Sequence, residues 1–165
     1  MIESGKVALT IESLSLEDVL NEACAMLENQ AQKSGVIINY APDDFLYLVD
    51  ADHIRLKQVF VNLLSNAIKY NKPNGSITLS CNQTAAQRIR INIEDTGNGM
   101  TIDELAQLFQ PFNRLGKQFS KIEGTGIGLV VCKRIVESMN GAIGVESTVG
   151  CGSNFWVELN LATPA

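Results

Sequence analysis

The segment RIRINIED, residues 88–95, alternates polar and apolar side chains and ends on a carboxylate. This alternation has a period of two residues and predicts a strand with one buried face. A buried carboxylate at the end of that strand needs a polar partner, because burial without one costs free energy. Two glycines, Gly97 and Gly99, follow Asp95 in the stretch DTGNGM. The strand end therefore predicts either a simple turn or a place where a ligand meets the carboxylate.

Two helices are predicted before this strand. The first follows Ser15, a suitable N-cap, and ends at Gly35, a residue that commonly stops helices. The second follows the N-cap candidate Asp52 and ends before NKPNG, because Pro73 and Gly75 do not continue a helix. Their apolar faces comprise Leu16, Val19, Leu20, Ala23 and Leu27 in the first helix, and Ile54, Val59, Phe60, Leu63, Leu64, Ala67 and Ile68 in the second.

The remaining segments predict a mixture of strands and helices. Strands are predicted at residues 36–40, 45–49, 76–81, 88–94, 142–147 and 153–161, with those at 76–81 and 88–94 forming an antiparallel pair. A short helix is predicted at residues 101–109, where Thr101 and Glu104 can form a capping box. Another begins on the glycines of GTGIGL and turns Val130, Ile135 and Met139 inward. This order predicts an α+β sandwich in which helices cover one side of a single sheet.

Length and composition exclude several classes of protein. The 165 residues favour one domain with a single sizeable core. A net charge of -5 argues against broad electrostatic binding to nucleic acid or anionic lipid. The chain has no apolar run long enough for a membrane span, and its first residues lack the apolar core of a signal peptide. The four cysteines show no CxxC spacing, which predicts reduced cysteines in a cytosolic domain.

The second predicted helix carries a polar row. Asn62, Asn66 and Lys69 are spaced i, i+4 and i+7 and so share one face. One interpretation is a solvated helix face. The other is a row of side-chain oxygens for Mg²⁺, a cation that takes few protein oxygens, with a lysine beside it for a phosphate.

Three glycine segments follow the second predicted helix. After Asp95, glycines can let the backbone pass close to a flat ring, with the exocyclic amine of adenine as partner of the carboxylate; a simple turn is the alternative. GTGIGL can direct backbone N–H groups toward phosphates, although it matches neither a Walker A loop nor a dinucleotide fingerprint. GCGSNFW is typical of a tight hairpin turn.

Taken in order, these segments resemble the catalytic and ATP-binding domain of sensor histidine kinases, part of the wider ATPase group that includes gyrase, Hsp90 and MutL. RLKQVFVNLLSNAIKY is similar to the N box, DTGNGM to the G1 box, LFQPFNRL to the F box, GTGIGLVVCKRIVE to the G2 box and GCGSNFW to the final glycine motif. The resemblance covers about residues 12–161. It implies the Bergerat fold, an α/β sandwich with a mixed, mostly antiparallel sheet, helices on one face and a mobile ATP lid at residues 110–123. It also implies a boundary: residues 1–11 end a dimerisation hairpin, and residues 12–165 form the catalytic domain.

The resemblance implies roles for individual residues. Asp95 would bind the adenine amine, partly through water, and Gly97 and Gly99 would admit the base. Asn66 would ligate Mg²⁺ with Asn62 assisting, and Lys69 would reach toward a phosphate. The other implied ATP contacts are Tyr70, Met100, Phe112, Arg114, Gly124, Thr125, Gly126, Ile127, Gly128, Leu129 and Ser153, with Phe109 anchoring the lid and Lys117 and Lys121 as further candidates for the γ-phosphate.

Asn62 separates two mechanisms within the resemblance. Hydrolytic relatives carry at this position a glutamate that activates water, whereas an amide cannot take a proton near neutral pH. The resemblance therefore implies that ATP is held intact and that its γ-phosphate passes to a histidine. The single histidine of this chain, His53, is interpreted as a structural or surface residue.

The partners implied are a histidine-bearing dimerisation domain of the same kinase and a response regulator receiver domain, with no nucleic acid. The chain is predicted to be a cytoplasmic fragment that binds ATP and Mg²⁺ and is monomeric by itself; whether the parent kinase is membrane-anchored stays open. Two alternatives also stay open. One is a nucleotide-binding module of a degenerate kinase, and the other is a stand-alone ATPase or serine kinase with the same fold.

Overall fold

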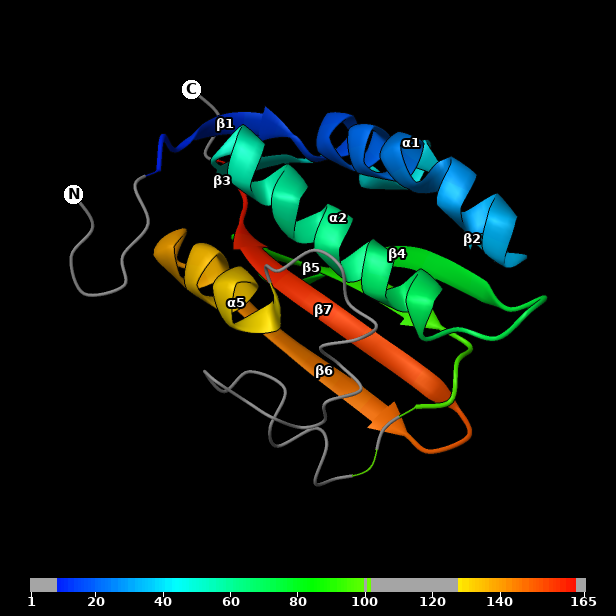
Figure 1. Cartoon of the computed structure of the whole chain (residues 1–165). Helices are drawn as coiled ribbons and strands as arrows, with labels where there is room; N and C mark the ends of the chain where they lie inside the picture. Colours follow the sequence, from blue (N-terminus) through cyan, green and yellow to red (C-terminus); the bar gives the residue numbers. More distant parts are fainter. Residues whose placement is uncertain (1–8, 100, 102–127, 163–165) are drawn as a thin grey trace.

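The computed structural model describes residues 9–99, 101 and 128–162. Within these ranges, α-helices cover one side of a five-stranded sheet, and a two-stranded sheet lies beside them (Figure 1). The elements in chain order are β1 (Glu12–Ser15), α1 (Leu16–Ser34), β2 (Ile37–Asn39), the 3₁₀ helix η1 (Pro42–Phe45), β3 (Leu48–Ala51), α2 (His53–Lys69), β4 (Ser76–Ala85), β5 (Arg88–Asp95), α5 (Gly128–Ser138), β6 (Ala142–Thr148) and β7 (Gly152–Asn160).

The larger sheet has the strand order β2-β4-β5-β7-β6. The β2–β4 pairing is parallel, and the other three pairings are antiparallel. The predicted mixed, mostly antiparallel sheet is confirmed. The predicted antiparallel pair of residues 76–81 and 88–94 is confirmed as well, in a register that sets Ile77 opposite Asp95.

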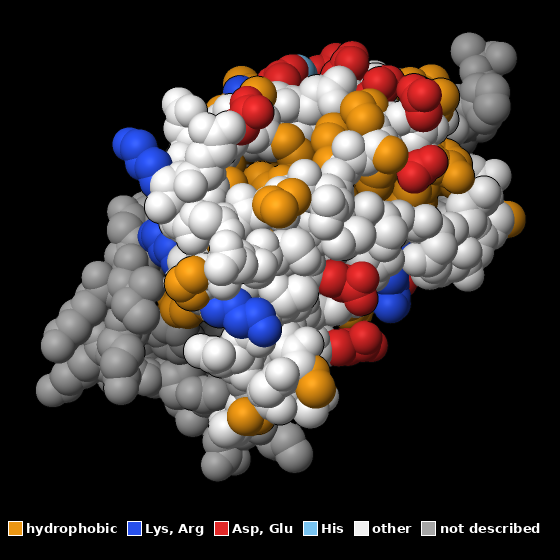
Figure 2. Space-filling model, turned by 90° about the vertical axis from the view of Figure 1, so that its right-hand side faces the viewer, with side chains coloured by type: hydrophobic (Ala, Val, Ile, Leu, Met, Phe, Trp, Pro, Cys, Tyr) orange, Lys and Arg blue, Asp and Glu red, His pale blue; other side chains and the backbone are white. Residues whose placement is uncertain are grey.

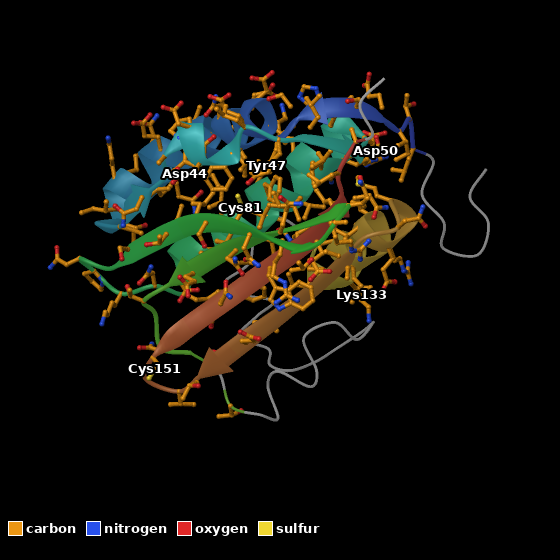
Figure 3. All side chains as sticks on the ribbon, turned by 180° about the vertical axis from the view of Figure 1, so that it is seen from behind. Asp44, Tyr47, Asp50, Cys81, Lys133 and Cys151 are labelled. Carbon is orange, nitrogen blue, oxygen red and sulfur yellow. The ribbon has the colours of Figure 1, made fainter. Side chains whose placement is uncertain are left out.

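The two faces of this sheet differ as the alternation in β5 predicts. Ile89, Ile91 and Ile93 are fully buried against the helices, together with Phe60 and Leu63 of α2. The opposite face carries polar side chains and is seen from behind in Figure 3. Burial on one face only is typical of an antiparallel sheet that is covered on one side.

The predicted helix ends are confirmed. The Ser15 hydroxyl accepts a hydrogen bond from the Asp18 N–H at 3.2 Å, and Gly35 ends α1 with φ +73°. Asp52 caps α2 by accepting from the Arg55 N–H at 3.0 Å. Both N-caps satisfy backbone donors that lack a partner within the helix.

The strand predicted at residues 45–49 is wrong in its first half. Pro42–Phe45 forms η1, which buries Phe45 against Tyr40 with the ring centroids 5.2 Å apart. The strand instead runs over Leu48–Ala51 and pairs with β1, an element that the sequence analysis missed. The paired residues lie 33 (Ser15 to Leu48) to 39 (Glu12 to Ala51) positions apart, and β1 is short, so local alternation carries little signal for it.

Two inward-facing predictions are also wrong. Ile54 is 72% exposed, because it lies in the first turn of α2 on the side away from the core; Leu56 is buried there instead. Val130 is only partly buried, whereas Leu129 and Cys132 of α5 belong to the core. The inward predictions for Ile135 and Met139 are confirmed.

The short helix predicted at residues 101–109 and the lid at 110–123 lie outside the described residues, apart from Thr101. The proposed boundary between residues 11 and 12 stays a prediction. The first described residues are tied to the rest of the fold, since the Thr10 N–H donates to Asp52 Oδ2 at 2.7 Å.

Candidate nucleotide-binding site

Asp95 ends β5 at the edge where the chain turns between β6 and β7, at the lower right of Figure 1. The residue is only 8% exposed. One carboxylate oxygen, Oδ1, accepts from the Gly97 N–H at 2.9 Å and from the Ser153 N–H at 3.2 Å. Burial raises the pKa of Asp95, and the two N–H donors oppose that rise without cancelling it. A buried acid that is held by two donors but still has a raised pKa is typical of functional sites.

Glycines bring three backbone segments together around this carboxylate. A Cβ on Gly97 would collide with the carbonyl oxygen of Tyr70 at the end of α2. A Cβ on Gly99 would collide with that of Thr148, and one on Gly152 with that of Asp95 itself. Gly99 and Gly152 also have φ +73° and +89°, values that favour glycine. The glycines of DTGNGM and of the final glycine motif therefore allow backbone segments of the protein to pack closely against each other. The predicted close approach of this backbone to a flat ring stays a prediction.

A polar cluster fixes the chain just after Asp95 to the loop after α2. The Thr96 hydroxyl accepts from the Ser76 N–H at 2.9 Å and contacts Asn71 Oδ1 at 3.1 Å. Asn71 in turn donates from Nδ2 to the Ser76 carbonyl at 3.0 Å. The sequence analysis did not predict this cluster, because its members are ordinary loop residues that meet only in the folded chain.

The polar row of α2 starts in the core and becomes accessible toward the C-terminal end. Asn62 is 2% exposed, and its Nδ2 lies 3.1 Å from Cys132 Sγ in α5. Asn66, Lys69 and Tyr70 are partly exposed and follow on the same stretch of helix. A buried Asn62 weakens the interpretation of this row as a simple solvated face, because a hydrated face would expose it.

Only some of the predicted site residues can be placed. Asp95, Gly97, Gly99 and Ser153 meet at the sheet edge beside Tyr70, and α2 carries Asn62, Asn66 and Lys69. Gly128 begins α5, and the side chain of Leu129 is buried in the core. The predictions for Met100, Phe109, Phe112, Arg114, Lys117, Lys121, Gly124, Thr125, Gly126 and Ile127 lie outside the described residues.

Ser147 of β6 is a residue of this region that the sequence analysis missed. Its hydroxyl donates to the Gly152 carbonyl at 2.9 Å and lies 2.8 Å from the Ser153 hydroxyl. Only the strand register reveals the connection, since β6 and β7 set Ser147 opposite Ser153. Cys151 lies near the tip of the turn between these strands (Figure 3).

A larger hollow of about 490 Å³ lies elsewhere, between α1 and β2. Its lining includes Cys24, Val36 and Tyr40, and Figure 2 shows hydrophobic side chains on this end of the molecule with acidic ones around them. It holds no lysine or arginine that could meet a phosphate. The smaller hollow at Asp95, of about 210 Å³, also has no lysine or arginine among its described lining residues. It is the better candidate for a nucleotide because it contains the buried Asp95 carboxylate, held by two backbone N–H groups.

The other reactive side chains of the described residues have structural explanations. His53 Nε2 lies 3.1 Å from both carboxylate oxygens of Glu22, which also contacts Lys57, so the prediction of a structural or surface role for His53 fits. Cys24, Cys81, Cys132 and Cys151, all among the described residues, are free. Among the described residues, no cluster of His, Cys, Asp and Glu could hold a metal ion, and no helix is long and apolar enough to span a membrane.

Comparison with protein families identifies the fold. Residues 51–163, more than half of the chain, match the family model described as "Histidine kinase-, DNA gyrase B-, and HSP90-like ATPase". The chain belongs to this ATPase family. The resemblance drawn from the five motifs is thereby confirmed at the level of the family, and the fold is the Bergerat fold.

Individual relatives point to sensor histidine kinases within this ATPase family. The chain is 37% identical to sensor histidine kinase GacS of Pseudomonas protegens over 97% of its own length and 18% of GacS. It is 43% identical to the adaptive-response sensory kinase SasA of Synechococcus elongatus, over 84% of this chain and 36% of SasA. Among solved structures, full-length ShkA in complex with AMPPNP superposes with a TM-score of 0.81 at 30% identity, covering 96% of this chain and 33% of ShkA.

The match is therefore to one part of larger kinases. The catalytic domain of histidine kinase ThkA, solved without nucleotide, covers 92% of this chain and 96% of its own length with a TM-score of 0.76 and 25% identity. By contrast, the chain spans about a fifth to a third of the curated relatives named above. This ATPase-family chain thus corresponds to the catalytic, ATP-binding domain of sensor histidine kinases.

Proposed function

We propose that this domain binds ATP with Mg²⁺ and donates the γ-phosphate to a histidine on a separate dimerisation domain of the same kinase. The observation that carries the proposal is the buried Asp95 carboxylate, held through Oδ1 by two backbone N–H groups at the end of β5. An acid fixed in this way can accept from the exocyclic amine of adenine. The membership in the ATPase family and the AMPPNP-bound relative ShkA support ATP as the ligand.

The residues of α2 fit a magnesium-bearing triphosphate. Asn62 and Asn66 offer neutral amide oxygens one turn apart, and Mg²⁺ accepts such oxygens when phosphates complete its shell. We assign Asn66 as the ligand, because it is partly exposed, and Asn62 as its support in the core. Lys69 lies in the last turn of the same helix and would reach toward a phosphate. Bound Mg²⁺ supplies positive charge that offsets the charge on the phosphate oxygens.

Asn62 favours transfer over hydrolysis. Its amide cannot accept a proton from water near neutral pH, and its Nδ2 is already directed at Cys132 Sγ. In the proposed transfer, the γ-phosphorus bonds to an imidazole nitrogen while its bond to the bridging oxygen breaks, and ADP leaves with that electron pair. The domain would contribute mainly position and electrostatic stabilisation. A response regulator receiver domain would be the next acceptor; the relative ThkA has been solved in complex with a response regulator protein.

A two-component assay tests this proposal. The purified chain is mixed with a histidine-bearing dimerisation hairpin and γ-labelled ATP. Acid-labile label on the hairpin supports the phosphodonor function. ATP binding without transfer indicates the module of a degenerate kinase, and release of free phosphate without a hairpin indicates an ATPase.

The metal assignment has its own test. We expect Asn66→Ala to remove the dependence of ATP affinity on Mg²⁺, measured by calorimetry with and without the cation. Thr78→Ala, on the exposed face of β4, serves as the control. A variant that keeps the full Mg²⁺ dependence would place the metal on other residues.

A further inference from the structure

Three polar residues form a row across neighbouring strands at the nucleotide edge of the sheet. The register of β5 and β7 pairs Asp95 with Ser153, and that of β7 and β6 pairs Ser153 with Ser147. Asp95 and Ser153 are each 8% exposed, and Ser147 is partly buried. All three line the hollow at this edge. Strand pairing therefore fixes the row, and the row extends the site by one strand beyond Ser153.

The hydrogen bonds of the row fix the direction of each hydroxyl. A carbonyl oxygen can only accept, so the 2.9 Å contact between Ser147 Oγ and the Gly152 carbonyl uses the single proton of Ser147. The 2.8 Å contact between the two serine hydroxyls must then take its proton from Ser153. Ser147 thus accepts a hydrogen bond from the Ser153 hydroxyl and donates one to the Gly152 carbonyl.

This direction determines what Ser153 can offer to a base. With its proton committed to Ser147, the hydroxyl of Ser153 has only lone pairs left and can accept but not donate. The neighbouring Asp95 carboxylate is also an acceptor. The sheet edge therefore presents acceptors from two adjacent strands, which favours a purine with an amine at C6 over one with an oxygen there.

We propose that Ser147 is a positioning residue for nucleotide specificity, which holds Ser153 as an acceptor and so selects 6-amino over 6-oxo purines. The proposal rests on the proposed ATP site at Asp95. Without Ser147, the hydroxyl of Ser153 can rotate and donate to a 6-oxo group. Leaving a polar group unpaired or wrongly paired is the usual way in which a site rejects a close analogue.

Three nucleotides and four variants test this inference. The affinities of ATP, inosine triphosphate and purine riboside triphosphate are measured by calorimetry for the wild type, Ser147→Ala, Ser147→Thr, Ser153→Ala and Ser80→Ala. Ser80 is exposed on β4 and serves as a matched control. We expect Ser147→Ala to lower the preference for ATP over inosine triphosphate about five- to tenfold, the effect of about one hydrogen bond. Ser147→Thr, which keeps the hydroxyl, should restore the preference.

Purine riboside triphosphate distinguishes positioning from general damage. It has no group at C6, so its affinity should stay within about twofold in Ser147→Ala; a merely structural role of Ser147 would weaken all three nucleotides together. A folded Ser147→Ala that keeps the wild-type preference overturns the inference. Should Ser147→Ala fail to fold, Ser153→Ala decides in the same way, since it removes the acceptor directly. A wild type that binds no nucleotide would overturn the proposed ATP site itself, which is a different result from a retained preference.

Discussion

Asp95 and Asp52 both accept hydrogen bonds from backbone N–H groups, yet their surroundings shift their pKa values in opposite directions. Asp52 caps α2 with Oδ1 and holds Thr10 with Oδ2. Desolvation pushes its pKa upward, but the N–H donors and the charge of Arg55 outweigh that effect and leave the pKa lowered. At Asp95 burial is stronger and prevails, so the pKa is raised.

The difference separates Asp52, an acid that caps a helix, from Asp95, the acid that we propose as the adenine contact. Both oxygens of Asp52 have backbone partners within the protein. The two backbone donors of Asp95 both reach Oδ1, and the ionised group is poorly solvated in the free protein. A hydrogen bond from an adenine amine would lower the free-energy cost of keeping the Asp95 carboxylate ionised and buried, and this gain would contribute to binding.

The largest effect is expected on ATP affinity. Asp95→Asn should weaken ATP binding about ten- to a hundredfold, because the amide keeps an acceptor for Gly97 and Ser153 but turns a donor toward the adenine amine. Titration calorimetry at pH 7 measures it. Asp52→Asn is the matched control, and it should bind ATP like the wild type. Equal losses in both variants would mean that Asp95 acts only through the fold.

Two glycines in the chain around the turn between β6 and β7, next to Asp95, test how tightly the backbone packs there. Gly150 and Gly152 share nearly the same φ, +87° and +89°, but a Cβ on Gly150 meets nothing within 4 Å whereas one on Gly152 collides with the Asp95 carbonyl. Gly150→Ala should therefore cost about 1 kcal/mol from backbone strain alone. Gly152→Ala should cost at least about 2 kcal/mol more, since backbone must move. Urea denaturation of both variants measures the difference; similar midpoints would show that the edge can relax.

Substitution of Asp52, the N-cap of α2, should change the stability of the fold and leave ATP affinity unchanged. Asp52→Ala removes an N-cap and the partner of the Thr10 N–H, so we expect a loss of about 1 kcal/mol in the free energy of unfolding. Thermal or urea unfolding measures it, and ATP affinity per folded molecule should be unchanged. Asp50→Ala, two residues earlier on β3, is a control that caps no helix. A loss of affinity in Asp52→Ala would show that the two ends of α2 are coupled.

The sequence predicted the local elements of these regions but not the pairings between distant segments. The helix caps at Ser15 and Asp52 and the strand ending at Asp95 follow from local patterns, and all were confirmed. Asp95 itself stood out because a carboxylate that ends a half-buried strand needs a polar partner. The β1–β3 pairing and the contact of Ser147 with Ser153 depend on register between distant segments, which no local pattern specifies. The exposure of Ile54 shows the same limit: helical periodicity defines a face, but tertiary packing decides how far along the helix that face is covered.

The smallest effect is a pair of opposite pH dependences in the free protein. The raised pKa of Asp95 means that the folded state binds more protons than the unfolded state between the ordinary aspartate pKa of 3.8 and the raised pKa. Stability from this group is full below 3.8 and falls as pH rises through the raised pKa. Asp95→Asn should therefore be more stable than the wild type at pH 7, with an advantage that disappears below about pH 4.

For Asp52 the lowered pKa gives stability that is present above pH 3.8 and is lost as the pH falls through the lowered pKa. Asp52→Asn should therefore be slightly less stable than the wild type at pH 7 and equal to it in acid. Urea unfolding of the three proteins from pH 3 to pH 7 measures both curves. Difference curves of the same sign would remove the contrast between the two acids, because burial at Asp95 would then not outweigh its two N–H donors.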